Sequence, residues 1–277
     1  MKGKAITLFT MTNILFLGEL VGRCGISSLK AGLAGIKTKY SVDYTIINGE
    51  GMTNGYGIGK QHSMQLGKLG IDLTTGGEKM FYKPDFVEFM QKCSFVLRPL
   101  NYPPQCPGKG AKNVTINKSQ FLIINLQGHS GMKQSIQNAF VTMESFLKKV
   151  EGDPVILVQY HAATTAEKAT MLHFLDGKVA AVIGTHTKVM SADERVTDNG
   201  TAFISDNGRV GSFMSVGGFD IDTEINKYRS QIPQRSREAW DDPRIQGVVV
   251  TIDESTKKAV EIKIVDEKID VKKPQEA

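Results

Sequence analysis

Strand-like and helix-like segments alternate along the first hundred residues, and this alternation constrains the fold more than any other feature of the chain. Short apolar runs expected as strands cover 13–17, 44–48, 73–75 and 95–97. Longer runs expected as helices cover 26–40, 60–69 and 84–92. Such a β-α-β rhythm is typical of sheets whose faces are covered by helices. The sequence therefore predicts an α/β fold.

The pattern changes after Pro99, where Tyr102-Pro103-Pro104 indicates a rigid loop. Beyond it, strands are expected over 113–116, 121–125, 155–160, 179–183, 201–205, 246–252 and 259–265, and helices over 140–150, 166–175 and 221–228. We predict one domain with two sheets over 13–265. Residues 1–12 are expected to be a flexible extension, with Met11 as an alternative start, and 266–277 a charged tail.

The bulk composition limits the partners and the compartment. The 277 residues carry a formal net charge of +5, which neither requires nor excludes an anionic ligand. No basic stripe with interleaved aromatic residues occurs along the sequence, so no nucleic-acid surface is predicted. No apolar run reaches the ~18 residues of a membrane helix. Three scattered cysteines, Cys24, Cys93 and Cys106, indicate neither a disulfide framework nor a cysteine zinc site, so a cytoplasmic location is expected.

Polar residues follow several expected strands at the points where these strands end, in most cases beside a glycine. They are Glu19, Glu50, Glu78, His161 and His186. Glycine there allows a tight turn and a close approach of the backbone to a ligand. Taken one at a time, each residue is more simply explained as a solvated loop residue, a helix cap or a structural histidine. Together they predict a mixed nitrogen and oxygen site for manganese, iron or zinc at the strand ends of one sheet.

One position in this group opposes a simple metal site. In the run Gly184-Thr185-His186-Thr187-Lys188, His186 can offer a neutral imidazole nitrogen to a metal. A second histidine two residues further on would share that role, but Lys188 stands there and brings a positive charge instead. Whether the chain is a working metal enzyme or an altered form of one depends largely on this lysine.

Several motifs resemble one bacterial family in their order and spacing. They are Phe16-Leu17-Gly18-Glu19-Leu20-Val21-Gly22, Ile46-Ile47-Asn48-Gly49-Glu50, Leu97-Arg98-Pro99-Leu100-Asn101, Ile124-Asn125-Leu126-Gln127-Gly128, His161-Ala162, Thr165-Ala166-Glu167-Lys168, Gly184-Thr185-His186-Thr187 and Ala202-Phe203-Ile204-Ser205-Asp206. With these residues the chain is similar, over about 13–265, to the YmdB-type metallophosphoesterases, which are calcineurin-like and cleave 2′,3′-cyclic nucleotides. The resemblance implies a four-layer α/β/β/α sandwich, with two metals at the strand ends and a hydroxide between them.

The resemblance also implies roles for individual residues, and several positions depart from the family pattern. At the first metal, the family's Asp corresponds to Glu19, the shared Glu to Glu50, its Asn neighbour to Gly51, and the last His to Lys188. Glycine offers no side-chain ligand, and the ammonium of Lys188 would repel a cation at close range. We therefore expect Lys188 to take the place of the first metal, with Glu19 as the weakest candidate ligand.

At the second metal, four candidate ligands remain. Glu50, His161 and His186 are kept, and Glu78 replaces an Asn with another oxygen ligand. These two carboxylates and two imidazoles suit one divalent metal. The proton-donating His of the family corresponds to Lys79, which would donate a proton only if its surroundings lowered its pKa.

Two functions follow from this comparison. In the first, the chain has lost most of its phosphodiesterase activity and serves as a binding or scaffold protein for a phosphate or nucleotide-like ligand, with one metal or none. In the second, it is an active phosphodiesterase or phosphatase with altered one-metal chemistry. The first is favoured, because a metal position and the proton donor are both changed. The resemblance also admits a homo-oligomer.

Overall fold

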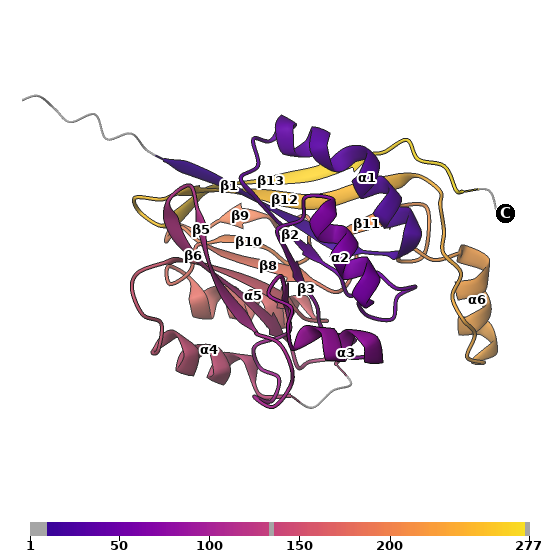
Figure 1. The fold of residues 1–277 in the computed structure, drawn as a ribbon, viewed down its shortest axis with the longest axis horizontal. Coiled ribbons are helices and arrows are strands. Elements are labelled where there is room, and N and C mark those ends of the chain that lie inside the picture. Colours follow the sequence, from indigo (N-terminus) through magenta and orange to yellow (C-terminus); the bar gives the residue numbers. More distant parts are fainter. Residues whose placement is uncertain (1–9, 133–135, 275–277) are drawn as a thin grey trace, which may run out of the picture.

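Two β-sheets pack face to face in the computed structural model, which describes residues 10–132 and 136–274 (Figure 1). The seven-stranded sheet contains, in spatial order, β13 (Lys258–Lys268), β12 (Pro243–Asp253), β11 (Arg209–Ser212), β1 (Met11–Leu20), β2 (Tyr44–Asn48), β3 (Leu73–Thr75) and β4 (Val96–Leu97). The six-stranded sheet contains β5 (Ala111–Ile116), β6 (Ser119–Gln127), β7 (Val155–His161), β8 (Ala181–Thr185), β10 (Ala202–Ile204) and β9 (Arg195–Val196). The prediction of an α/β fold with two sheets is confirmed.

Helices cover the outer faces of both sheets. They are α1 (Gly22–Lys39), α2 (Lys60–Lys68), α3 (Pro84–Met90), α4 (Ala139–Leu147), α5 (Thr165–Leu175) and α6 (Ile221–Ser230). The first three lie beside the seven-stranded sheet and the next two beside the six-stranded sheet, whereas α6 stands apart at one end (Figure 1). None of the helices in the described part of the chain is both long and apolar enough to cross a bilayer.

Three apolar clusters separate four layers. Along β1, Leu15 and Leu17 pack in the cluster beneath α1, α2 and α3, whereas Ile14 and Phe16 pack in the cluster between the sheets. Successive side chains of a strand point to opposite faces, so both faces of β1 are buried and its sequence is a continuous apolar run. A third cluster lies between the six-stranded sheet and α4 and α5. The predicted α/β/β/α sandwich is confirmed.

The terminal strands pair more extensively than the sequence predicts. β1 begins at Met11 rather than at 13, because it pairs with β12 from Met11 opposite Asp253. β13 continues to Lys268, which lies opposite Arg244 of β12, so the predicted tail begins with strand residues. Residues 1–9 of the predicted extension and 275–277 of the predicted tail lie outside the described residues.

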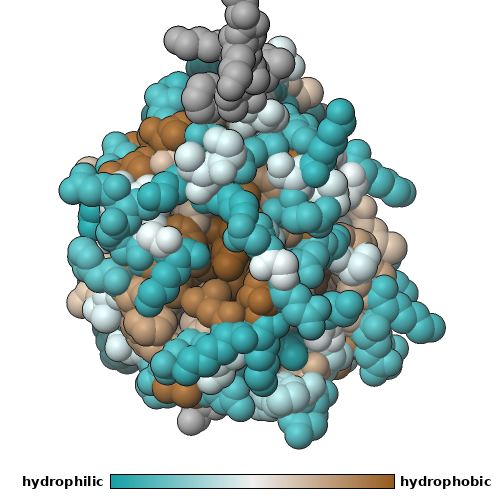
Figure 2. Space-filling model, turned by 90° about the vertical axis from the view of Figure 1, so that its left-hand side faces the viewer, coloured by the Kyte–Doolittle hydropathy of each residue, from teal (hydrophilic) through white to brown (hydrophobic). Residues whose placement is uncertain are grey.

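Parallel strands place their carboxyl ends at one end of the molecule. β1 to β4 are parallel neighbours, and so are β6, β7, β8 and β10. Loops at such ends commonly carry ligands in α/β proteins. Figure 2 views the opposite end, where apolar side chains line a hollow with a hydrophilic rim. A cavity of about 580 Å³ lies near the starts of β7 and β8, away from any group of metal-ligating side chains that the described residues form.

Gly184 provides a test of how closely neighbouring segments approach in the six-stranded sheet. A Cβ at this position would lie 1.9 Å from the backbone oxygen of Ser205. Because backbone atoms cannot rotate away, we expect Gly184→Ala to lower the free energy of unfolding by about 3 kcal/mol. Gly35→Ala is the matched control, since no atom lies within 4 Å of its new Cβ in α1.

The control should instead raise the free energy of unfolding by about 0.5–1 kcal/mol, because alanine is the better helix former. Urea unfolding followed by circular dichroism measures both variants. An equal change in the free energy of unfolding for the two variants would contradict the close approach of Gly184 to the backbone of Ser205.

Candidate metal centre

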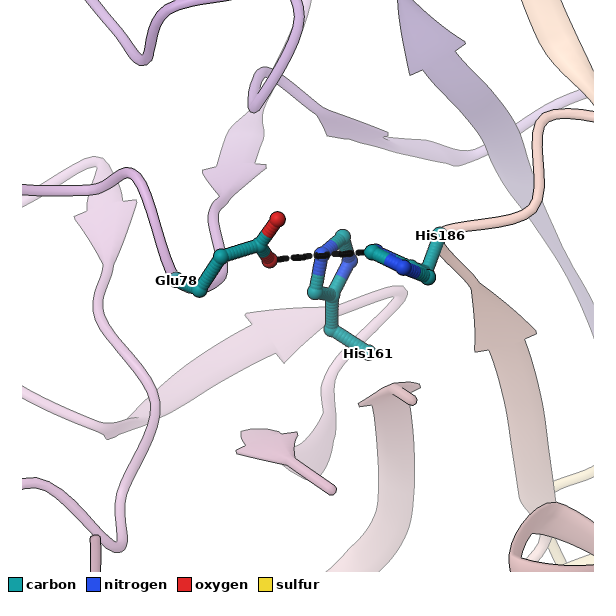
Figure 3. A group of neighbouring side chains, drawn as sticks. All are labelled: Glu78, His161 and His186. Atoms are coloured by element: carbon teal, nitrogen blue, oxygen red, sulfur yellow. Dashed lines mark hydrogen bonds and ion pairs between the residues drawn. The ribbon is translucent and has the colours of Figure 1, made fainter. Parts of the chain in front are cut away.

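Three metal-ligating side chains converge where the two sheets meet (Figure 3). His161 is the last residue of β7, His186 follows β8, and Glu78 lies in the loop after β3. His161 Nε2 lies 2.8 Å from Glu78 Oε2 and 3.2 Å from His186 Nδ1. One ligand atom from each residue lies within 4.8 Å of the others. The group forms across two sheets, not along one sheet as predicted, because β3 belongs to one sheet and β7 and β8 to the other.

The surroundings of His161 hold its ring in one orientation. Its Nδ1 lies 2.9 Å from Thr185 Oγ1 and 3.2 Å from Asn48 Nδ2. Its Nε2 therefore points at Glu78. Gly77 is required for this arrangement, because a Cβ there would lie 2.1 Å from His161 Cδ2. The glycine after β3 thus leaves room for the imidazole, in addition to allowing a turn of the backbone.

The charges of the three side chains suit a cation between them. Burial and the neighbouring His161 lower the pKa of His186 to about 3, so its imidazole is neutral at neutral pH. Burial would lower the pKa of His161 and raise that of Glu78. The hydrogen bond between these two side chains and their opposite charges outweigh burial. The pKa of His161 is therefore raised and the pKa of Glu78 is lowered. A proton thus lies between the imidazole of His161 and the carboxylate of Glu78. A divalent metal that bound these two side chains would replace this proton.

Glu50, predicted as a fourth ligand, uses its carboxylate differently. Its two oxygens accept backbone N–H groups, one from Gly77 and the other from Lys79. The side chain is fully buried, and burial raises its pKa to about 7. Glu50 therefore holds the loop that carries Glu78, and it lies outside the group of three converging ligands.

Lys188 and Glu19 form an ion pair beside this group. Lys188 Nζ lies 3.3 Å from Glu19 Oε1, without the alignment of a hydrogen bond, and the Glu19 side chain is only 1% exposed. A Cβ at Gly51 would lie 2.7 Å from the same carboxylate oxygen. The long Glu19 side chain therefore occupies space that any larger residue at position 51 would need. Glu19, Gly51 and Lys188 thus fit one another in space.

Lys79 borders the same group, but its surroundings do not lower its pKa as a role as proton donor would require. Its Nζ lies 3.6 Å from Glu78 Oε1. Burial would lower the pKa of Lys79, but the carboxylates of Glu19, Glu78 and Glu50 outweigh burial and raise it. The side chain therefore contributes a positive charge at the edge of the three ligands.

Asp206 holds the loop that carries His186 and Lys188, a role that sequence reasoning missed. Its Oδ2 accepts from Lys168 Nζ at 3.1 Å and from the backbone N–H of Thr187 at 2.8 Å. The backbone φ of His186 is 110°, which costs energy in a residue other than glycine. Asp206 and Lys168 are both buried, so their ion pair supports this strained loop from inside. In the sequence, the only indication of this role is that Lys168 and Asp206 each end one of the motifs that resemble the family.

The layered fold matches the solved structure of a phosphatase, and together with the convergent Glu78, His161 and His186 it defines a metallophosphoesterase. The family described as YmdB-like protein matches residues 15–265. The chain therefore belongs to the YmdB-like family, within the metallophosphoesterases and phosphodiesterases.

Relatives match this chain over nearly the whole domain. The 2′,3′-cyclic-nucleotide 2′-phosphodiesterase of Bacillus subtilis is 35% identical over 249 residues, which cover 90% of this chain and 94% of the relative. The crystal structure of a novel phosphatase from Mycoplasma pneumoniae has a TM-score of 0.88 at 30% identity and 95% coverage of both chains. A hypothetical protein from Thermus thermophilus has a TM-score of 0.87 at 27% identity, with 94% of this chain and 100% of that chain covered.

Asp206→Ala tests the support of the histidine loop. The change leaves the buried ammonium of Lys168 without its carboxylate, so we expect the free energy of unfolding to fall by about 3–5 kcal/mol. Glu144→Ala is the control, because it breaks a surface pair with Lys148 at 3.3 Å and should cost less than about 0.5 kcal/mol. Urea unfolding compares the two variants, and similar losses would mean that the buried pair does not support the loop.

Proposed function

We propose that this chain binds one divalent metal and a phosphate or nucleotide-like phosphoester, and that its hydrolysis of phosphodiesters is lost or strongly reduced. The ion pair between Lys188 and Glu19 is the observation that carries this proposal. The proposal is supported because the ammonium of Lys188 lies beside Glu19, a residue for which the family resemblance implies contact with a first metal. Two unit charges of the same sign at 4 Å repel by about 4 kcal/mol at an effective dielectric of 20, which opposes a metal there.

Glu78, His161 and His186 would hold the single metal. Glu50 would be a fourth ligand only if one of its carboxylate oxygens exchanged its backbone N–H partner for the metal. Two imidazoles with carboxylates suit manganese, iron or zinc, and membership of the family supports a divalent metal at this place. When bound, such a metal polarises phosphoryl oxygens. The ammonium of Lys79, which lies against Glu78, would bind and neutralise a phosphate oxygen.

Two features oppose fast hydrolysis. A single metal cannot clamp the attacking and the leaving oxygen as a two-metal site does. Lys79 stands where the family has a proton-donating imidazole, and a lysine has an ordinary pKa of about 10.4, which is a poor match for proton transfer at neutral pH. Loss of a matched general acid lowers the rate by about 10²–10⁴-fold.

A second candidate function is an active phosphodiesterase with altered one-metal chemistry. The convergence of Glu78, His161 and His186 favours it, because a ligand set for one metal persists. The 35% identity to a Bacillus subtilis phosphodiesterase over nearly the full length also favours it. Metal content and turnover together separate the two candidates.

Elemental analysis after separate loading with Mn²⁺, Fe²⁺ and Zn²⁺ tests the metal site. We expect one tightly bound metal per chain, and its loss in His161→Ala and His186→Ala. His173→Ala is the control, because His173 lies in the last turn of α5, outside the ligand group. Two tightly bound metals in the unchanged protein would contradict the role proposed for Lys188.

The converse change should restore the second metal. Glu19→Asp, Gly51→Asn and Lys188→His must be combined, because a Cβ at Gly51 alone would meet the Glu19 carboxylate at 2.7 Å. We expect the triple variant to bind two metals per chain. The single Gly51→Asn variant should be less stable than the triple variant. A folded triple variant that still binds one metal would oppose the positional assignment of the first site.

Turnover of 2′,3′-cyclic AMP and of bis(p-nitrophenyl) phosphate tests the loss of activity. We expect the metal-loaded protein to hydrolyse both at a rate near the background, because the second metal and the matched acid are replaced. Release of product would be followed by chromatography and absorbance. Clear turnover that disappears in His161→Ala, but persists in His173→Ala, would support the active phosphodiesterase instead.

A further inference from the structure

We propose that a cationic groove beside the metal centre binds the backbone of single-stranded nucleic acid. On this view the ligand is a phosphoester within or at the end of an oligonucleotide, and not a free mononucleotide. The inference rests on the proposed function in one respect, namely that the chain binds phosphoesters. The groove consists of two adjacent cavities.

The first cavity adjoins the metal ligands. It has a volume of about 350 Å³, and three lysines line it together with a single acidic residue, Glu224. The lysines are Lys79, Lys188 and Lys227. Lys79 connects the cavity to the metal centre, because its Nζ lies 3.6 Å from Glu78 Oε1. A phosphate bound by the metal would therefore lie at the mouth of a cavity lined by three ammonium groups, each of which is paired with one carboxylate.

The second cavity extends this charge away from the metal. It has a volume of about 660 Å³, and Arg23, Arg235, Arg237 and Lys273 line it with one carboxylate, Glu238. Glu238 accepts from Arg23 Nε at 3.0 Å. Among the ion pairs of the described residues, neither Arg235 nor Arg237 has a carboxylate within 4.0 Å. Both arginine side chains belong to exposed residues, so they are available to an anion.

The two cavities share part of their walls. Asn54 and Ser236 line both of them, so the cationic side chains form one continuous groove. A terminal phosphate carries only about 1.5–2 negative charges at neutral pH, which the metal and the nearby lysines already balance. The arginines of the second cavity therefore exceed what a mononucleotide needs. They are matched by further phosphates along a chain.

Aromatic side chains favour a nucleic acid over other polyanions. Tyr56 lines the first cavity beside Phe219, which is buried, and Trp240 lines the second. Tyr56 is 45% exposed, and the buried Trp240 Nε1 has no acceptor among the described residues. Base stacking on aromatic rings along a positively charged groove is how proteins bind single strands without sequence preference. Inorganic polyphosphate and acidic peptides have no bases that would use these rings.

Fluorescence anisotropy with a labelled single-stranded RNA of about twelve nucleotides tests the groove in metal-free protein. We expect the double variant Arg235→Gln/Arg237→Gln to weaken binding at least tenfold. The slope of log K against log[salt] should become shallower by about 1.4, since each phosphate contact contributes about 0.7 on single strands. Lys148→Gln/Lys149→Gln is the matched control, because both lysines are exposed on the distant α4 side. This control should bind within twofold of the unchanged protein.

Three outcomes would overturn the inference. They are equal binding of AMP and the oligonucleotide, equal binding of polyphosphate or polyglutamate, and equal weakening by the two double variants. Circular dichroism would check that the variants are folded. The metal count separates this inference from the proposed function. One metal per chain without oligonucleotide binding would contradict only the proposed groove. Two metals per chain with arginine-dependent RNA binding would contradict only the one-metal proposal.

Discussion

The apolar interface between the two sheets determines where every residue of the metal centre lies. Ile14 and Phe16 of one sheet belong to the same buried cluster as Phe121 and Ile123 of the other. Because this cluster fixes the sheets face to face, the loops after β3, β7 and β8 meet at one end. No single strand or sheet contains the ligand set. Disturbing the interface would therefore separate Glu78 from the histidines before any ligand itself was changed.

Carboxylates with little exposure set the second constraint, because each needs a positive partner or hydrogen-bond donors in a medium that solvates charge poorly. Glu78 has His161 and Lys79, and Glu19 has Lys188. In a two-metal enzyme, metals provide this compensation. Here an ammonium provides part of it, and the absence of a side chain at Gly51 gives Glu19 the necessary space. Glu19, Gly51 and Lys188 thus form one consistent arrangement, which is the physical basis for proposing a single metal.

The groove gives a reason for retaining the site even where hydrolysis is slow. Lys188 lines the first cavity as well as pairing with Glu19, so one side chain belongs both to the proposed groove and to the surroundings of the metal ligands. Binding by phosphate contacts and stacking needs no proton donor. The proposed groove and the proposed single metal are therefore compatible with each other.

The sequence by itself determined the α/β class, the two sheets and most element positions, because apolar periodicity is a local property, whereas the four layers were implied by the family resemblance. β2 and β3 have the predicted bounds of 44–48 and 73–75, and His161 and His186 stand at strand ends as expected. The two-residue β9 and the four-residue β11 were not predicted, since such short strands exist only through their pairing with neighbours. Pairing with β12 likewise decided where β1 begins and β13 ends.

Only the tertiary structure decided how the site residues act. In the folded protein the Glu50 carboxylate accepts two backbone N–H groups, and Asp206 holds the loop that carries His186. Three nearby carboxylates raise the pKa of Lys79. The tertiary structure also assembled the groove from segments as distant as Arg23 and Arg237. These contacts join residues far apart in the chain, and their energies depend on burial and distance, neither of which is encoded in local spacing.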